Sequence, residues 1–213
     1  MDSKKKIVII VSSVLVVVAI AIGLIIIFLN RSSQAAKVGK FFTGPAVFIE
    51  TPDKFDKKDR SEFELGIFVT ELGKDVYPAA SFSISFDPNK MEFLGLEEGS
   101  VLIADSDAPS GENVPEWSVD VETCNKTGLI NVMYLDISGK DKGFTQDKLS
   151  EDDNSLFYLK FKLRGTVKEK DIIDIAFKDA CFACEDDSKS LTMLNKKLKT
   201  KDSFVMIADS KSK

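Results

Sequence analysis

Residues 81–99 read S-F-S-I-S-F-D-P-N-K-M-E-F-L-G-L-E-E-G, and this stretch carries the pattern that decides the fold. Its first half alternates serines with the apolar residues Phe82, Ile84 and Phe86. Such alternation is typical of a strand with one buried side and one solvent-facing side. A turn follows at residues 87–89, because proline fixes φ and asparagine tolerates the left-handed region. An apolar pattern then resumes from Met91, so the stretch predicts strand, turn, strand.

Similar short runs recur along the chain, and turn signals separate them. The further strands are expected at residues 46–50, 62–70, 116–122, 129–137, 155–163, 172–177, near 191–194 and at 203–207. A hairpin turn is expected at 124–128, and no amphipathic helix is evident. Short strands at regular spacing predict an all-β sandwich of about nine strands.

The amino-acid composition of the chain excludes several classes of function. The chain has 213 residues, and its sixteen Phe against three Tyr and one Trp place most aromatic mass in the core. Histidine is absent, which removes the commonest general base and the usual nitrogen ligand of zinc. The net charge of −5 has the wrong sign for a nucleic-acid partner. We therefore expect a protein that is not an enzyme and binds no nucleic acid.

The N-terminus predicts a membrane anchor. Residues 7–29 contain no charged side chain, and about 20 apolar residues suffice to cross a bilayer. Three lysines at positions 4–6 precede this run, so the N-terminus is expected in the cytoplasm and the C-terminal domain outside the cell. A cleaved signal peptide is the alternative, because 33–35 loosely matches a cleavage site, but its apolar region would be shorter.

The resulting layout has five parts. They are a cytoplasmic tail (1–6), a transmembrane anchor (7–29), a stalk (30–44), a β-sandwich (45–208) and a disordered tail (209–213). The expected location is the cell membrane, with a single crossing.

Cysteines and acidic clusters offer weak site candidates. An extracellular domain permits a disulfide, either between Cys181 and Cys184 or from one of them to Cys124. Three free thiols packed as small apolar groups are an equal alternative. Acidic clusters at 105–107, 151–153 and 185–187 lack the complete calcium-loop pattern, so we expect no cofactor, although one structural calcium ion is compatible with them. Asn125 begins a glycosylation acceptor sequence, a motif short enough to arise by chance.

The order of these motifs resembles that of cohesin domains. The resemblance rests on Phe86-Asp87-Pro88 after an alternating strand, on an acidic residue before Gly99, and on the runs at 129–136 and 155–163. It covers roughly residues 45–208. The resemblance implies a jelly-roll sandwich whose flat outer face binds dockerins, which are small calcium-dependent modules carried by enzymes.

In cohesins this face is built from the third, fifth, sixth and eighth strands. The matching segments here are 81–86, 116–122, 129–136 and 172–177. Alternation along the third strand places its three serines outward, and the polar Asn131 indicates which side of the sixth strand faces solvent. The expected partner-binding residues are Ser81, Ser83, Ser85, Asn131, Met133 and Leu135. Met133 and Leu135 are either anchors of the interface or residues covered by a loop.

The sequence thus predicts a non-catalytic, membrane-anchored, extracellular binding module. It would recruit a dockerin-bearing protein or another surface protein through one sheet face. The third strand departs from the family pattern, because serines stand where many cohesins present larger polar residues, so the partner stays open. A carbohydrate-binding module of the same architecture is the alternative, and it would need an aromatic platform built from residues such as Trp117.

Overall fold

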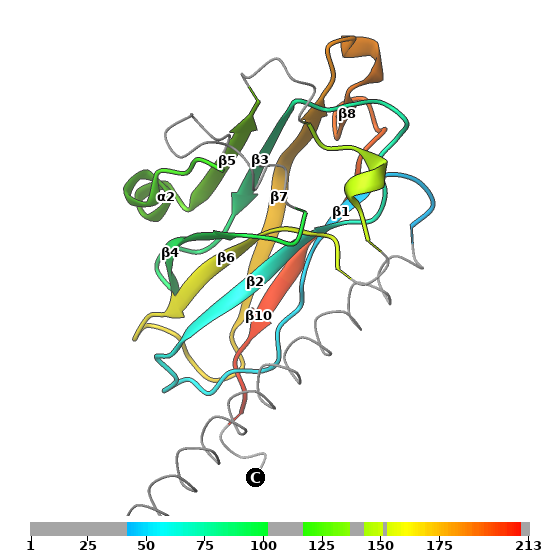
Figure 1. Ribbon diagram of the computed structural model, residues 1–213. Coiled ribbons are helices and arrows are strands. Elements are labelled where there is room, and N and C mark those ends of the chain that lie inside the picture. Colours follow the sequence, from blue (N-terminus) through cyan, green and yellow to red (C-terminus); the bar gives the residue numbers. More distant parts are fainter. Residues whose placement is uncertain (1–41, 102–116, 137–142, 151–152, 210–213) are drawn as a thin grey trace, which may run out of the picture.

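The computed structural model describes residues 42–101, 117–136, 143–150 and 153–209 (Figure 1). Within these residues the chain forms ten strands and one short α-helix, α2 (Val121–Thr127). The strands are β1 (Ala46–Ile49), β2 (Glu62–Val69), β3 (Ala79–Ser85), β4 (Met91–Glu98), β5 (Leu129–Leu135), β6 (Ser155–Leu163), β7 (Ile172–Ala183), β8 (Leu191–Thr192), β9 (Lys199–Lys201) and β10 (Ser203–Met206). Two 3-10 turns, η1 (Gln146–Lys148) and η2 (Asp187–Lys189), lie in the connections.

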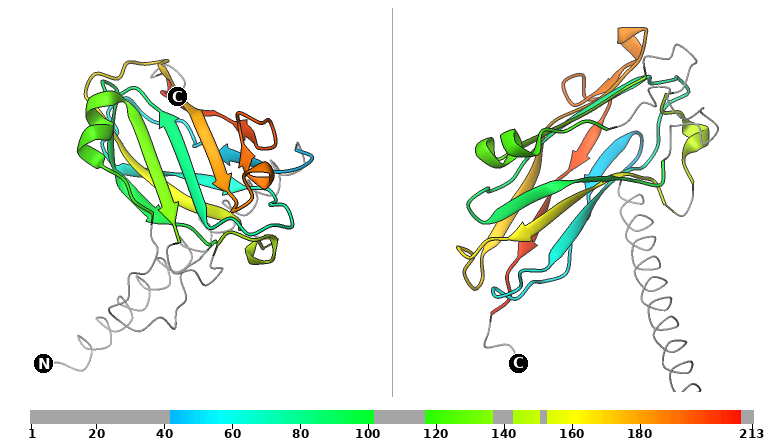
Figure 2. Two further views of the ribbon diagram at one scale, coloured as in Figure 1. Left: turned by 90° about the horizontal axis from the view of Figure 1, so that it is seen from above. Right: turned by 60° about the vertical axis from the view of Figure 1, so that its left-hand side comes forward.

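The strands form two sheets that pack face to face, as Figure 2 shows. The first sheet has the order β4-β6-β2-β1-β9, and the second has the order β10-β7-β3-β5, with β8 paired to β7. The chain changes sheets at every step from β2 to β7. The predicted all-β sandwich is confirmed, with ten strands in the described residues where about nine were expected.

Phenylalanine side chains fill the space between the sheets. Phe82 of β3 lies at the centre, and its ring centroid is 5.5 to 5.8 Å from those of Phe182, Phe157 and Trp117. Phe82 and Phe157 are essentially inaccessible to solvent. Burying each such side chain stabilises the fold by roughly 1.5–3 kcal/mol. The apolar residues of the alternating segment 81–86 therefore lie at the centre of the core, as predicted.

A β-bulge interrupts β7. Ser83 pairs with Asp179, but the next residue of β3, Ile84, pairs with Phe177. Lys178 is therefore an extra residue in the strand, and both Lys178 and Asp179 are exposed. The bulge changes the phase of β7, so that Phe177 before it and Ala180 after it both point into the core. The strand also continues to Ala183, well beyond its predicted end at 177.

The predicted strand at 116–122 and the predicted hairpin turn at 124–128 are wrong. In the described part of this segment Ser118 forms a single bridge to Met133 of β5, and α2 then begins. The carboxylate of Asp120 caps the helix by accepting hydrogen bonds from the Thr123 amide at 3.1 Å and hydroxyl at 2.8 Å. Gly128 ends it with a positive φ of 70°, a conformation that glycine adopts without strain.

In the described part of the chain, no helix has the length and apolar character that a bilayer crossing requires. The span predicted at 7–29, the cytoplasmic tail at 1–6 and most of the stalk lie outside the described residues. So does nearly all of the C-terminal tail, of which only Asp209 is described.

Candidate docking face

The outward side of the second sheet, from β5 across β3 to β7, is called the docking face below. All six predicted partner-binding residues lie on it: Ser81, Ser83, Ser85, Asn131, Met133 and Leu135. Their neighbours in sequence, such as Phe82 and Val132, are buried on the other side of the same strands. Met133 and Leu135 are 55% and 52% exposed, so no described residue covers them. The predicted orientation of β3 and β5 is therefore confirmed.

Strand register arranges the docking face in rows. Ser83 stands between Asn131 of β5 and Asp179 of β7, and its hydroxyl donates to Asn131 Oδ1 at 2.7 Å. Ser81, one row along, stands between Met133 and Cys181. Directly opposed side chains in adjacent antiparallel strands are about 5 Å apart, so each row forms one continuous contact surface. The face thus has a polar row beside a more apolar one.

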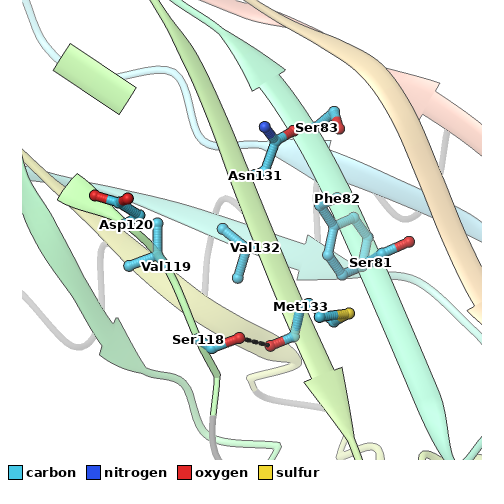
Figure 3. A pocket seen from close by; sticks show the side chains of 9 residues that line it. All are labelled: Ser81, Phe82, Ser83, Ser118, Val119, Asp120, Asn131, Val132 and Met133. Carbon is cyan, nitrogen blue, oxygen red and sulfur yellow. Dashed lines mark hydrogen bonds between the residues drawn. The ribbon is translucent and has the colours of Figure 1, made fainter. Parts of the chain in front are cut away.

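A shallow groove runs along the β5 side of the docking face (Figure 3). Its volume is about 460 Å³, and its lining residues come from β3, β5 and the segment before α2. They are Ser81, Phe82, Ser83, Ser118, Val119, Asp120, Asn131, Val132 and Met133. The Ser118 hydroxyl donates to the Met133 carbonyl at 3.2 Å and holds this wall against β5. The groove is large enough for side chains of a partner and open enough to admit them.

Sequence reasoning missed two residues of the docking face, Lys178 and Asp179. The bulge brings both to the surface beside Ser83, whereas the predicted strand stopped at 177. The signal was present in the sequence. The apolar residues at 173, 175 and 177 have odd numbers, whereas those at 180 and 182 have even numbers. Both sets can face the core from one strand only if an extra residue lies between them.

Asn125 has a structural role at the border of the docking face. Its side-chain amide donates to the Phe93 carbonyl at 2.7 Å and accepts from the Phe93 amide at 2.9 Å. Asn125 therefore completes the free edge of β4 as a neighbouring strand would. It also donates to the Val121 carbonyl at 3.1 Å within α2. With these bonds in place, the amide that a glycan would need is already engaged.

The side chains suited to stacking on sugars are inside the protein. Trp117 is 8% exposed, and Tyr77, Tyr134 and Tyr158 are buried as well. These four are the only Trp and Tyr of the chain. Burial also raises the pKa of Tyr134, whose hydroxyl has no hydrogen-bond partner within the described structure. The polysaccharide-binding alternative therefore lacks the aromatic platform that it requires.

All three cysteines are free thiols in the structure, so it contains neither the bridge between Cys181 and Cys184 nor one from either of them to Cys124, and it has the third of the arrangements left open by the sequence. Residues 181–183 are extended in β7, which separates the two Cα atoms by about 10 Å, whereas a disulfide requires less than about 7 Å. Burial, together with the nearby carboxylates of Asp179 and Asp187, raises the pKa of Cys181. Cys124 lies buried in α2.

The described residues contain no cluster of three acidic or cysteine side chains placed to hold a metal ion. Asp186 instead caps η2 by accepting from the Ser188 amide at 3.1 Å and hydroxyl at 2.7 Å. These bonds, led by the one from the hydroxyl, lower the pKa of Asp186. The acidic cluster at 105–107 and two members of the cluster at 151–153 lie outside the described residues.

Comparison with known proteins agrees with this architecture. The model of the cohesin domain family matches residues 47–200, which is well over half of the chain. The chain belongs to the cohesin domain family. The matched region contains every strand of the docking face and ends within β9, so that β10 follows it. No curated protein matches the chain.

Solved structures of cohesins have the same fold. The third cohesin of ScaC from Acetivibrio cellulolyticus, solved with the ScaB dockerin, is 15% identical and has a TM-score of 0.55 over 78% of this chain and 99% of that chain. The cohesin of the OlpA–Doc918 complex from Clostridium thermocellum is 18% identical, with a TM-score of 0.55 and coverage of 78% and 99%. A non-cellulosomal cohesin from the archaeon Archaeoglobus fulgidus is 16% identical, with a TM-score of 0.51 and coverage of 79% and 94%.

Proposed function

We propose that this cohesin is a non-catalytic module that recruits a dockerin-bearing protein, or another surface protein, through the docking face. The observation that carries the proposal is the exposure of Met133 and Leu135 on neighbouring outward positions of β5. Large apolar side chains that are half exposed together on a regular sheet favour a protein partner that covers them. The serines of β3 and Asn131 beside them add hydroxyl and amide groups suited to hydrogen bonds with a partner.

Several solved cohesins of this fold were determined as complexes with dockerins, among them those from A. cellulolyticus and C. thermocellum. The A. fulgidus relative is described as non-cellulosomal, so membership of the fold leaves the type of host assembly open. A dockerin is the first partner to test for this chain because three of the four segments matched to the family's binding face form strands, the exception being 116–122. The three strands are β3, β5 and β7, side by side in one sheet.

We further propose that residues 7–29 hold the module at the outer side of a membrane. The uncharged run and the three lysines before it support this arrangement. Protease treatment of intact cells tests it. The sandwich should be digested while a cytoplasmic control survives, and the undigested anchor should stay with the membrane fraction after alkaline extraction. Full protection of the sandwich in intact cells would contradict the proposal.

The function itself is tested with dockerins encoded in the same genome. Each dockerin is fused to a fluorescent protein and titrated against the full chain in detergent micelles, with calcium and with a chelator. We expect saturable binding of at least one dockerin that disappears in chelator, because dockerins fold around their calcium. If no dockerin binds, or if binding is indifferent to calcium, recruitment of a dockerin is excluded for this chain.

A further inference from the structure

The bulge in β7 brings a charged pair to the middle of the docking face. Lys178 and Asp179 are consecutive in the sequence, and in a regular strand their side chains would point to opposite sides. Because Lys178 is the extra residue, both side chains are exposed on the outward side, directly beside Ser83. Bulges commonly re-aim side chains at functional sites, and this one leaves the core intact, since Phe177 and Ala180 remain inward.

Neither charge has an ion-pair partner within the described part of the protein. Lys178 forms no ion pair with any described residue, whereas lysines elsewhere on the surface, such as Lys160 with Glu97 at 2.6 Å, do so. Asp179 accepts one hydrogen bond, from the Ala180 amide to Oδ1 at 2.9 Å. Its Oδ2 has no partner among the described residues. The pair is therefore open to solvent and available to a binding partner.

The two charges belong to one row with Asn131 and Ser83. That row runs from β5 through β3 to β7 and contains an amide, a hydroxyl and the charged pair. It lies next to the row of Met133 and Ser81. An apolar anchor therefore lies beside a polar row in which the positions of the positive and the negative charge are fixed. In such an arrangement the apolar contacts provide affinity, and the charges select the partner.

We propose that Lys178 and Asp179 form the specificity element of the docking face. They select a dockerin surface that presents a carboxylate opposite Lys178 and a lysine or arginine opposite Asp179. This inference rests on the proposed function, and it specifies which charges the dockerin must carry on the surface that binds. A dockerin with the reversed charge order places like charges against each other, and its binding is weakened accordingly.

The test is a charge exchange, Lys178→Glu with Asp179→Lys, in the full chain. Affinity and association rate for the best-bound dockerin of the same genome are measured at low and high salt. The exchange is expected to weaken binding by about tenfold or more, and a dockerin with its own facing charges exchanged should restore it. The matched control is Glu62→Lys with Lys162→Glu, a cross-strand pair on the opposite face of the sandwich, and it should leave affinity unchanged.

The outcomes separate the two proposals. If the exchanged chain folds with the stability of the original and binds the dockerin equally well, the specificity element is wrong, while recruitment through the docking face stands. If the original chain binds none of the dockerins, the proposed function fails and this inference fails with it. If the Glu62/Lys162 control weakens binding as much as the bulge exchange, the loss of affinity is not specific to the docking face, and the inference is overturned.

Discussion

Asn125 joins α2 to the edge of β4 through a single side chain. Its amide group pairs with both the amide and the carbonyl of Phe93, and the residue is only partly accessible. No other described side chain forms a hydrogen bond to the Phe93 backbone. Removing the amide therefore leaves a backbone donor and acceptor at a poorly hydrated sheet edge.

We expect Asn125→Ala to lower the free energy of unfolding by about 1–3 kcal/mol, because the unpaired backbone groups are not fully returned to water. Urea unfolding of the full chain, followed by circular dichroism, measures the loss. Lys126→Ala, at the next position of the same helix, is the control and should change the value by no more than about 0.5 kcal/mol. Equal stability of the two variants would show that Asn125 does not join α2 to β4.

Asp120 gives α2 a pH-dependent cap. Hydrogen bonds from Thr123, first from its amide and then from its hydroxyl, hold the pKa of Asp120 below its usual value. A carboxylate whose pKa is lowered on folding stabilises the protein above its unfolded pKa, which is about 4, and the contribution disappears as the pH falls through the lower folded pKa. The cap should therefore be complete at neutral pH and lost in acid.

The difference in unfolding free energy between the original chain and Asp120→Ala should follow this course. It should be constant above about pH 5 and shrink steadily below about pH 4. Urea unfolding at a series of pH values measures it. A difference that stays the same down to strongly acidic pH would mean that Asp120 does not act through its charged form.

At the scale of elements, the sequence predicted best where a strand carries its own pattern. β3 and β5 alternate strictly, so their buried and exposed sides followed from parity alone. α2 was missed because Trp117, Val119 and Val121 imitate a strand in their spacing. The stronger signals were Asp120 as a cap and Gly128 as a terminator, which together enclose a single helical segment.

Two other elements depend on contacts that no local pattern reveals. β9 (Lys199–Lys201) has no apolar alternation, and it is a strand because it pairs in parallel with β1, about 150 residues earlier in the chain. The groove on the docking face likewise depends on a tertiary contact, the hydrogen bond from the Ser118 hydroxyl to the Met133 carbonyl of β5. The docking face was predictable from the alternation of side chains along each strand, whereas its groove follows from tertiary structure.

The bulge in β7 makes a specific prediction. If Lys178 is the extra residue, its deletion leaves a strand in which Phe177, Ala180 and Phe182 still point inward, with regular alternation throughout. The deletion variant should therefore fold and unfold cooperatively. Deleting Ser83 from β3, a strand that alternates regularly throughout, should turn one half of that strand inside out and abolish folding.

Thermal unfolding followed by circular dichroism distinguishes these variants. A single sharp transition is expected for the Lys178 deletion, and its absence for the Ser83 deletion. Loss of the transition on deleting Lys178 would mean that the register of β7 is fixed in some other way.

At the scale of the whole molecule, the sandwich places core-forming residues and solvent-facing residues on opposite sides of the same strands. One side of β3 supplies Phe82 to the centre of the core, and the other side supplies hydroxyl groups to the docking face. The two roles are carried by alternate residues of one strand, so the outward residues can change with little effect on the fold. Met133 and Leu135 have the same freedom, because more than half of each side chain is already exposed.

The most direct measurement is calorimetric titration of a dockerin into the full chain and into the double variant Met133→Asp, Leu135→Asp. Leu194→Asp, in the turn between β8 and β9 where Leu194 is 92% exposed, is the matched control. Loss of two interface anchors is expected to weaken binding by at least about 100-fold, while the control binds like the original chain. Unchanged affinity in a folded double variant would contradict the assignment of the docking face.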